Sequence, residues 1–235
     1  MNCRGRLLQT DPALVMGIIN VTPDSFYDGS RNMDPGKIRA IAAEMIELGA
    51  DILDVGAYSS RPGAGDISEG EEISRLERSL SVIRDSFPEA LLSVDTFRSG
   101  VARIVVEDFK VDIINDISGG DLDPKMFPTI ADLQVPYVLM HMKGSPLTMQ
   151  EHASYTDVVR EIIRTLSDKI GHLNRLGVND IIIDPGFGFA KTIDQNFEIL
   201  RQLEAFHIFS QPLMTGISRK SMICKTLDCS PAEAL

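Results

Sequence analysis

DIIIDPGFG, residues 180–188, is an apolar run that closes in a polar, glycine-rich turn, and a stretch with helical spacing follows it. The same pattern occurs seven times, in MGIIN (16–20), DILDVG (51–56), LLSVDT (91–96), VDIINDISGG (111–120), PYVLMHM (136–142), DIIIDPGFG (180–188) and PLMTGISRKS (212–221). Parallel strands that are covered on both faces read as continuous apolar runs, and regular strand–helix alternation indicates an α/β fold. The sequence therefore predicts a TIM-type (β/α)8 barrel whose eighth strand–helix unit is absent from this chain.

Size and composition fit one such barrel. The chain has 235 residues, 43% of them hydrophobic and 24% charged, and no linker-like segment divides it, so we expect residues 1–235 to form a single domain. No apolar stretch reaches the roughly 18–20 residues of a membrane span. Residues 1–12 have two arginines but no apolar core, so we expect them not to be a secretory signal. The net charge of −11 argues against a nucleic-acid partner. Three scattered cysteines suit a reducing cytoplasm.

Helix signals lie between the apolar runs. Asp34-Pro35 is typical of an N-cap followed by proline at the first helical position. Ser68 and Glu71 have the spacing of a capping box, and Ser218 is a candidate cap for a last helix over residues 219–227. Further helices are predicted over residues 98–109, 124–133, 156–176 and 194–206.

Polar residues stand where the apolar runs end, which in a barrel is the end that carries catalytic groups. Asn20, Asp95, Asn115 and Asp184 all occupy such positions. An Asn amide can ligate a hard cation or bind a phosphate oxygen, but Asn and Asp also serve as simple turn residues. Residues 218–221, SRKS, could bind an anion at a helix start or be a solvated helix end. His141 ends another run and invites a role as a general base. We expect it to be structural, because the reaction expected of this chain needs no strong base near neutral pH.

Two long polar segments, 20–34 and 56–70, are either binding loops or surface connections. They carry part of a wider resemblance. MGIINVTPDSFYDG (16–29), ADILDVGAYSSRPGA (50–64), SVDTFRSGVA, DIINDISGG, VLMHMKGSPLTMQ, IIIDPGFGFAKT and GISRKS resemble, in order, the signature blocks of the dihydropteroate synthase family of pterin-binding enzymes. The resemblance covers nearly the whole chain.

The resemblance implies a transferase of folate biosynthesis that joins 6-hydroxymethyl-7,8-dihydropterin diphosphate to p-aminobenzoate, with sulfonamides as competitors. Asp184 would accept hydrogen bonds from the pterin 2-amino group and ring N–H, while Asp95 and Asn115 meet other ring heteroatoms. Met140 and Phe189 would lie beside the ring. Lys220 would reach the pterin carbonyl, and Ser221 the carboxylate of p-aminobenzoate. Asp95, Asp184 and Lys220 are the expected catalytic residues.

The loops and the metal follow from the same resemblance. Phe26, Ser60 and Pro62 would form walls around p-aminobenzoate, and Asn20 would lie at a Mg²⁺–diphosphate site. Arg61 would meet the diphosphate or order the other loop. Tyr58 stands where the family usually has a glutamate, which removes any role of that carboxylate. A homodimer is also implied.

Two other functions remain open at this point. A methyltetrahydrofolate–corrinoid methyltransferase would share the residues at the pterin edge but should lack the NVTPDSF, SSRPG and SRKS segments. A non-catalytic pterin-binding fragment is the other, because the chain ends at PAEAL (231–235), where the family continues to an Arg-x-His motif. We expect the departure of diphosphate to precede attack by the amine, as in an SN1-like reaction.

Overall fold

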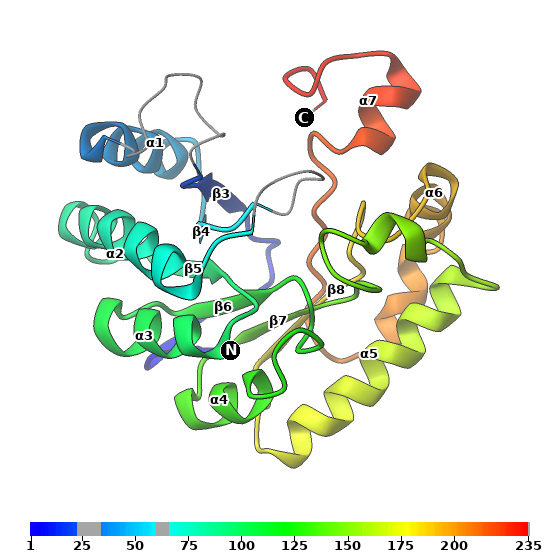
Figure 1. Cartoon of the computed structure of the whole chain (residues 1–235), viewed down its shortest axis with the longest axis horizontal. Coiled ribbons are helices and arrows are strands. Elements are labelled where there is room, and N and C mark those ends of the chain that lie inside the picture. Colours follow the sequence, from blue (N-terminus) through cyan, green and yellow to red (C-terminus); the bar gives the residue numbers. More distant parts are fainter. Residues whose placement is uncertain (23–33, 60–65, 235) are drawn as a thin grey trace.

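The computed structural model describes residues 1–22, 34–59 and 66–234 (Figure 1). Six strands form one parallel sheet in the order of the sequence. They are β3 (Met16–Asn20), β4 (Ile52–Gly56), β5 (Leu91–Asp95), β6 (Ile113–Asp116), β7 (Tyr137–Met140) and β8 (Ile181–Asp184). The helices are α1 (Pro35–Glu47), α2 (Glu69–Ser86), α3 (Ser99–Phe109), α4 (Met126–Leu133), α5 (Val158–Arg175), α6 (Ile193–Arg201) and α7 (Ser221–Leu227). The strands lie in the middle of the molecule and the helices outside them (Figure 1).

The seventh apolar run continues the sheet beside β8. Ile183 donates its N–H to the carbonyl of Pro212 (2.9 Å), and Met214 donates to the carbonyl of Ile183 (2.8 Å). This single parallel bridge, Ile183 to Leu213, places residues 212–214 next to β8. Within the described part of the chain, no backbone hydrogen bond joins residues 212–214 to β3. The predicted α/β barrel architecture is confirmed over seven consecutive parallel segments.

Local signals account for most helix starts. The side chain of Asp34 accepts the N–H of Gly36 with Pro35 in the first turn, as predicted, and Ser68 accepts the N–H of Glu71. The reciprocal half of that capping box does not form, because the Glu71 carboxylate binds Arg75 Nε at 2.8 Å instead. A complete capping box forms where none was predicted, between Thr192 and Gln195.

Two predicted helix boundaries are wrong. The last helix, α7, begins at Ser221 with Lys220 at the N-cap position, so Ser218 does not cap it. Arg219, which has a left-handed φ of 58°, separates Ser218 from the helix and explains the shift. The helix predicted over 194–206 ends at Arg201, after which Leu203–Ile208 forms a 3-10 helix.

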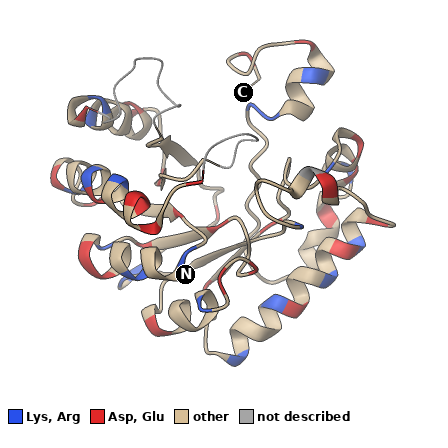
Figure 2. Cartoon of the chain, viewed as in Figure 1, with Lys and Arg blue, Asp and Glu red and all other residues tan. Residues whose placement is uncertain are grey.

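Apolar side chains fill the space between helices and sheet. The buried face of α5, for example, comprises Val158, Val159, Ile162, Leu166, Ile170 and Leu173. Each fully buried side chain of this size stabilises the fold by roughly 1.5–3 kcal/mol. Charged residues lie mainly along the outer surfaces of the helices (Figure 2). No helix in the described ranges combines the length and apolarity that crossing a bilayer requires.

A second apolar cluster closes the amino-terminal end of the barrel interior. We call it the floor: Ile52, Leu91, Ile113, Val138 and Ile182 from the strands, together with Cys3. Cys3 belongs to a short hairpin of β1 (Asn2–Cys3) and β2 (Arg6–Leu7), which the apolar pattern did not predict. The hairpin is held below the sheet by a bond from the N–H of Asn2 to Asp180 Oδ2 (2.9 Å). The site must therefore lie at the opposite, carboxyl end.

Candidate functional site

On the interior face of β6 and β8, a polar residue follows each floor residue two positions nearer the carboxyl end of the strand. Side chains two residues apart point to one face of a strand, so Asn115 stands above Ile113 of the floor and Asp184 above Ile182. Asp95 pairs in register with Asn115, and Met140 with Asp184. We call Asp95, Asn115, Asp184 and Lys220 the polar ring.

Asp95 is a carboxylate held among other carboxylates. Burial raises its pKa well above the ordinary value, and the negative charges of Asp54, Glu72 and Asp116 raise it further, while Lys220 opposes the shift. Such a group favours positive charge in its surroundings, because opposite charges attract strongly where the dielectric is reduced.

Asn20 reaches the neighbourhood of Asp95 across a glycine. A Cβ at Gly56 would lie 3.4 Å from Asp95 Cβ and 3.6 Å from Asn20 Oδ1. The missing side chain therefore leaves the space between β3 and β5 open. Asn20 is exposed at the end of β3, where its amide is accessible from outside.

Asp184 is oriented by the turn that follows it. Its Oδ1 accepts the N–H of Gly186 at 2.7 Å, which leaves Oδ2 without a partner among the described residues. Gly186 has φ +72°, and a Cβ there would lie 2.1 Å from the carbonyl oxygen of His141, so only glycine fits. Burial raises the pKa of Asp184, whereas Lys220 and Lys191 lower it.

Lys220 brings a cation from the seventh run to the polar ring. Its Nζ donates to the carbonyl of Phe187 at 2.6 Å and lies 4.5 Å from the centre of the Phe189 ring. Burial lowers the pKa of Lys220, and the charges of Asp184 and Asp95 oppose this. Three ring members thus act on one another electrostatically, although they are far apart in the sequence.

A second buried lysine, which the sequence pattern does not single out, holds the backbone below the ring. Lys191 Nζ donates to the carbonyls of His141 (3.2 Å), Gly186 (2.8 Å) and Phe189 (2.9 Å). Burial lowers its pKa to about 7. Its spacing from Asp184 carries no recognisable signal, because the three acceptors are backbone atoms that only the folded turn brings together.

His141 fits the structural role expected for it. The side chain is 1% exposed, and burial together with the nearby lysines lowers its pKa to about 2. A neutral, enclosed imidazole is poorly placed to exchange protons with a substrate.

An apolar wall lies beside the polar ring. Met140 is 3% exposed and shares a cluster with Ile117, Met142, Met149 and Ala190, against which Phe97 and Phe189 pack. Methionine and phenylalanine offer polarisable, flat contacts to an aromatic ligand. The interior thus offers hydrogen-bonding groups in the ring next to an apolar surface.

Asp54 lies between the floor and the polar ring, two residues beyond Ile52 on β4. Asn115 Nδ2 donates to Asp54 Oδ2 at 3.0 Å. This carboxylate was not predicted as a site residue, although a charged residue inside the apolar run ILDVG is a signal that could have found it.

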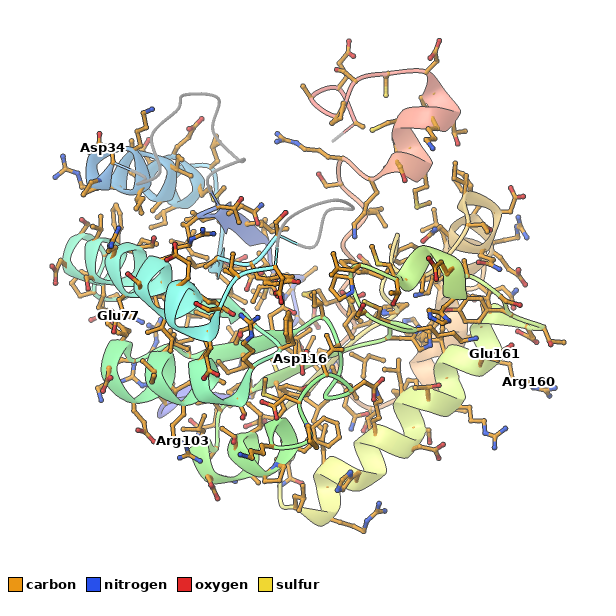
Figure 3. All side chains as sticks on the ribbon, viewed as in Figure 1. Asp34, Glu77, Arg103, Asp116, Arg160 and Glu161 are labelled. Atoms are coloured by element: carbon orange, nitrogen blue, oxygen red, sulfur yellow. The ribbon has the colours of Figure 1, made fainter. Side chains whose placement is uncertain are left out.

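Asp116, next to Asn115, has a different role. It accepts hydrogen bonds from the N–H and Oγ of Ser118, the N–H of Gly120 and Tyr137 Oη. Figure 3 shows it near the centre of the molecule, whereas Arg103 and Arg160 lie on outer helices. Asp116 therefore fastens the turn after β6.

Not every predicted residue joins the ring. Ser221 is exposed as the first residue of α7, and in the described ranges its side chain makes no hydrogen bond to the ring. Phe26, Ser60, Arg61 and Pro62 lie outside the described residues. Their predicted roles stay predictions.

Tyr58, at the position where the resemblance implied a glutamate, makes an aromatic contact. Its ring packs edge-on against Phe97, with centroids 5.0 Å apart, and the Arg98 guanidinium lies 5.5 Å from its centre. Arg98 also binds the buried carboxylate of Glu72, which accepts a 2.7 Å bond from Thr96 Oγ1. At this position a ring–cation contact occurs in place of a carboxylate.

Comparison with known proteins agrees with this geometry. The family model described as "Pterin binding enzyme" matches residues 16–234. Dihydropteroate synthase of Escherichia coli (strain K12) is 41% identical over 236 residues, which is 99% of this chain and 82% of the relative.

Solved structures give the same result. The Yersinia pestis dihydropteroate synthase, in a sulfonamide drug complex, superposes with a TM-score of 0.90 at 36% identity, over 99% of this chain and 84% of that one. The Xanthomonas albilineans enzyme, with 4-aminobenzoic acid, gives 0.86 at 37% identity, over 99% and 83%. The chain therefore belongs to the pterin binding enzyme family, among the dihydropteroate synthases.

Proposed function

We propose that this chain condenses 6-hydroxymethyl-7,8-dihydropterin diphosphate with p-aminobenzoate, giving 7,8-dihydropteroate and diphosphate. The observation that carries the proposal is the convergence of Asp95, Asn115, Asp184 and Lys220 on one interior face, beside Met140 and Phe189. Relatives that share 41% of its residues are named for this reaction.

Asp184 would hold the edge of the pterin. Its free Oδ2 can accept from the 2-amino group and the adjacent ring N–H, as a carboxylate accepts from a forked pair of donors. Asn115 and Asp95 would meet the remaining heteroatoms. The pterin faces would rest on the apolar wall of Met140 and Phe189.

The ring's charge favours departure of the diphosphate first. When the C–O bond to the methylene carbon breaks, the diphosphate keeps the electron pair and the pterin carries the positive charge. Asp95 and Asp184 stabilise that charge by Coulomb attraction. The amine of p-aminobenzoate then forms the new C–N bond and loses a proton to solvent, while Lys220 interacts electrostatically with both carboxylates.

The second substrate would be bound from the exposed end of the site. Ser221 at the start of α7 would receive its carboxylate, and Phe26, Ser60 and Pro62 would enclose its ring, with Arg61 toward the diphosphate. Sulfonamides share the aminobenzene shape, and the Yersinia pestis relative has been solved with such a drug, so we infer competition at this position.

The residues present fit a Mg²⁺ ion that arrives with the diphosphate. In the described part of the chain no group of three or more His, Cys, Asp or Glu side chains could hold a metal by itself. Asn20 offers an exposed amide oxygen beside the space that Gly56 leaves. Mg²⁺ commonly takes a protein oxygen, water and substrate phosphates. Bound there by Asn20, the ion would neutralise charge on the leaving diphosphate.

We further propose a cytoplasmic homodimer. The three cysteines are unpaired, which suits a reducing compartment. Sedimentation of the purified chain measures the oligomeric state directly.

The decisive experiment measures p-aminobenzoate-dependent release of diphosphate, with pterin diphosphate binding followed separately by calorimetry. We expect both, and expect a sulfonamide to raise the KM for p-aminobenzoate. Pterin binding without diphosphate release would identify a binding module, and the absence of pterin binding would overturn the proposal.

A further inference from the structure

Asp54 and Asn115 form a buried contact between two strands that are not neighbours. Asp54 is on β4 and Asn115 on β6, with β5 between them. Their side chains meet at 3.0 Å, and the two residues are 3% and 8% exposed. Asp54 is in register with Ser93 and therefore lies one layer deeper than the Asp95–Asn115 pair. It stands behind the polar ring and does not belong to it.

The contact decides which end of the Asn115 amide faces the ligand. An amide has one donor end and one acceptor end, whereas a carboxylate only accepts. Because Nδ2 points to Asp54 Oδ2, Oδ1 must point elsewhere, and it has no partner among the residues described. Asn115 therefore offers an acceptor to whatever fills the ring.

We propose that Asp54 is a positioning residue that fixes Asn115 as a hydrogen-bond acceptor for an N–H of the pterin. The inference rests on the proposed function, because it concerns the same site. Without Asp54, the amide could turn by half a rotation and present Nδ2, so that donor would meet donor.

The link between the two residues is selective. Ser93 Oγ lies in the same buried layer and lowers the pKa of Asp54, but neither Ser93 Oγ nor Asp54 Oδ1 forms a hydrogen bond of normal geometry. Among hydrogen bonds formed by the described side chains, Asn115 is thus the partner of Asp54. Asp54 also acts on the polar ring through its negative charge, which raises the pKa of Asp95. A variant cycle must therefore separate the effect that passes through Asn115 from this effect of charge.

A double-mutant cycle tests this selectivity. The dissociation constant of 6-hydroxymethyl-7,8-dihydropterin diphosphate is measured by calorimetry for Asp54→Leu, Asn115→Ala and the double variant. We expect Asp54→Leu to weaken binding about tenfold, the value of one hydrogen bond of about 1.4 kcal/mol, and less than twofold in the Asn115→Ala background. A tenfold effect in both backgrounds would overturn the proposal.

Matched variants control for folding and chemistry. Ser93→Ala removes a hydroxyl in the same layer but leaves the Asn115 contact, so binding should stay within twofold. Asp54→Asn keeps the volume and one acceptor, and it should lose less affinity than Asp54→Leu. The KM for p-aminobenzoate should not change in either position-54 variant. If Asp54→Leu does not fold, the cycle is run with Asp54→Asn.

The amide itself provides a readout that does not depend on the ligand. In the free protein, the Nδ2 protons of Asn115 should exchange slowly in nitrogen-15 NMR spectra, because they are buried against Asp54. In Asp54→Asn their signal should move and exchange faster; an unchanged signal would contradict the positioning role. Failure of the wild-type protein to bind pterin diphosphate would instead count against the proposed function.

Discussion

On β6 and β8 the floor and the polar ring share one interior face, and a step of two residues separates them. Ile113 is followed by Asn115 and Ile182 by Asp184. The floor buries apolar side chains and stabilises the fold. The ring keeps carboxylates where burial raises their pKa, which costs stability. Both layers are enclosed, so burial alone does not distinguish core from site; the chemistry of the enclosed groups does.

The largest effect is expected from a change in the ring, Asp184→Asn. An asparagine would keep its oxygen on the N–H of Gly186 and turn its NH₂ toward the pterin, where donor meets donor. Losing two charged hydrogen bonds of about 1.5–3 kcal/mol each should weaken pterin diphosphate binding about a thousandfold. Calorimetry checks this; wild-type affinity would exclude Asp184 from the pterin edge.

A floor change should instead reduce stability. Ile113→Ala removes a fully buried side chain and leaves a cavity, which costs about 2–5 kcal/mol in the free energy of unfolding. Urea denaturation measures it, and pterin affinity of the folded variant should remain within threefold. A cost below 1 kcal/mol would mean that the floor repacks.

Unlike the floor variant, Asp95→Asn in the polar ring should increase the free energy of unfolding. The folded pKa of Asp95 is raised, so the folded state binds more protons and wild-type stability falls as pH rises through that pKa. An asparagine at position 95 does not titrate, so the variant does not lose stability in this way as pH rises. It should be more stable than wild type at pH 8, by about 1.4 kcal/mol for every tenfold difference in proton affinity between the folded and unfolded states, and the gain should shrink toward pH 4.

Urea unfolding at pH 8, 6 and 4.5 tests that sign. Activity should fall at the same time, since Asp95 belongs to the ring. A variant that is less stable than wild type at pH 8 would show that Asp95 is not held at an energetic cost.

The smallest effect is expected away from both layers. Arg103 on α3 forms exposed ion pairs with Glu107 and Asp132 at 3.2 and 2.9 Å. Arg103→Gln should change the free energy of unfolding far less than Ile113→Ala does, because solvent screens exposed ion pairs, and less still in 0.5 M salt. If urea denaturation shows a larger change, Arg103→Gln cannot serve as the surface control for the floor and ring variants.

Particular elements show how far the sequence could predict this structure. The starts of the apolar runs predicted the starts of six strands within two residues, because strands covered on both faces need unbroken apolar sequence. The seventh run also lies in the sheet, but with one bridge. The hairpin around Cys3 escaped prediction because strands of two residues carry no periodicity. Asp184 and Asn115 were predicted from their places at strand ends and from the resemblance.

The sequence by itself determined the order and direction of the strands, the covering helices and the family, because repeating patterns and motifs are local. Only the tertiary structure decided that Asp54 meets Asn115 across β5 and that Lys191 binds three carbonyls. It also brought Lys220 to Asp95 and Asp184. Those contacts depend on strand register and on backbone atoms of distant turns, and no spacing along the chain encodes either.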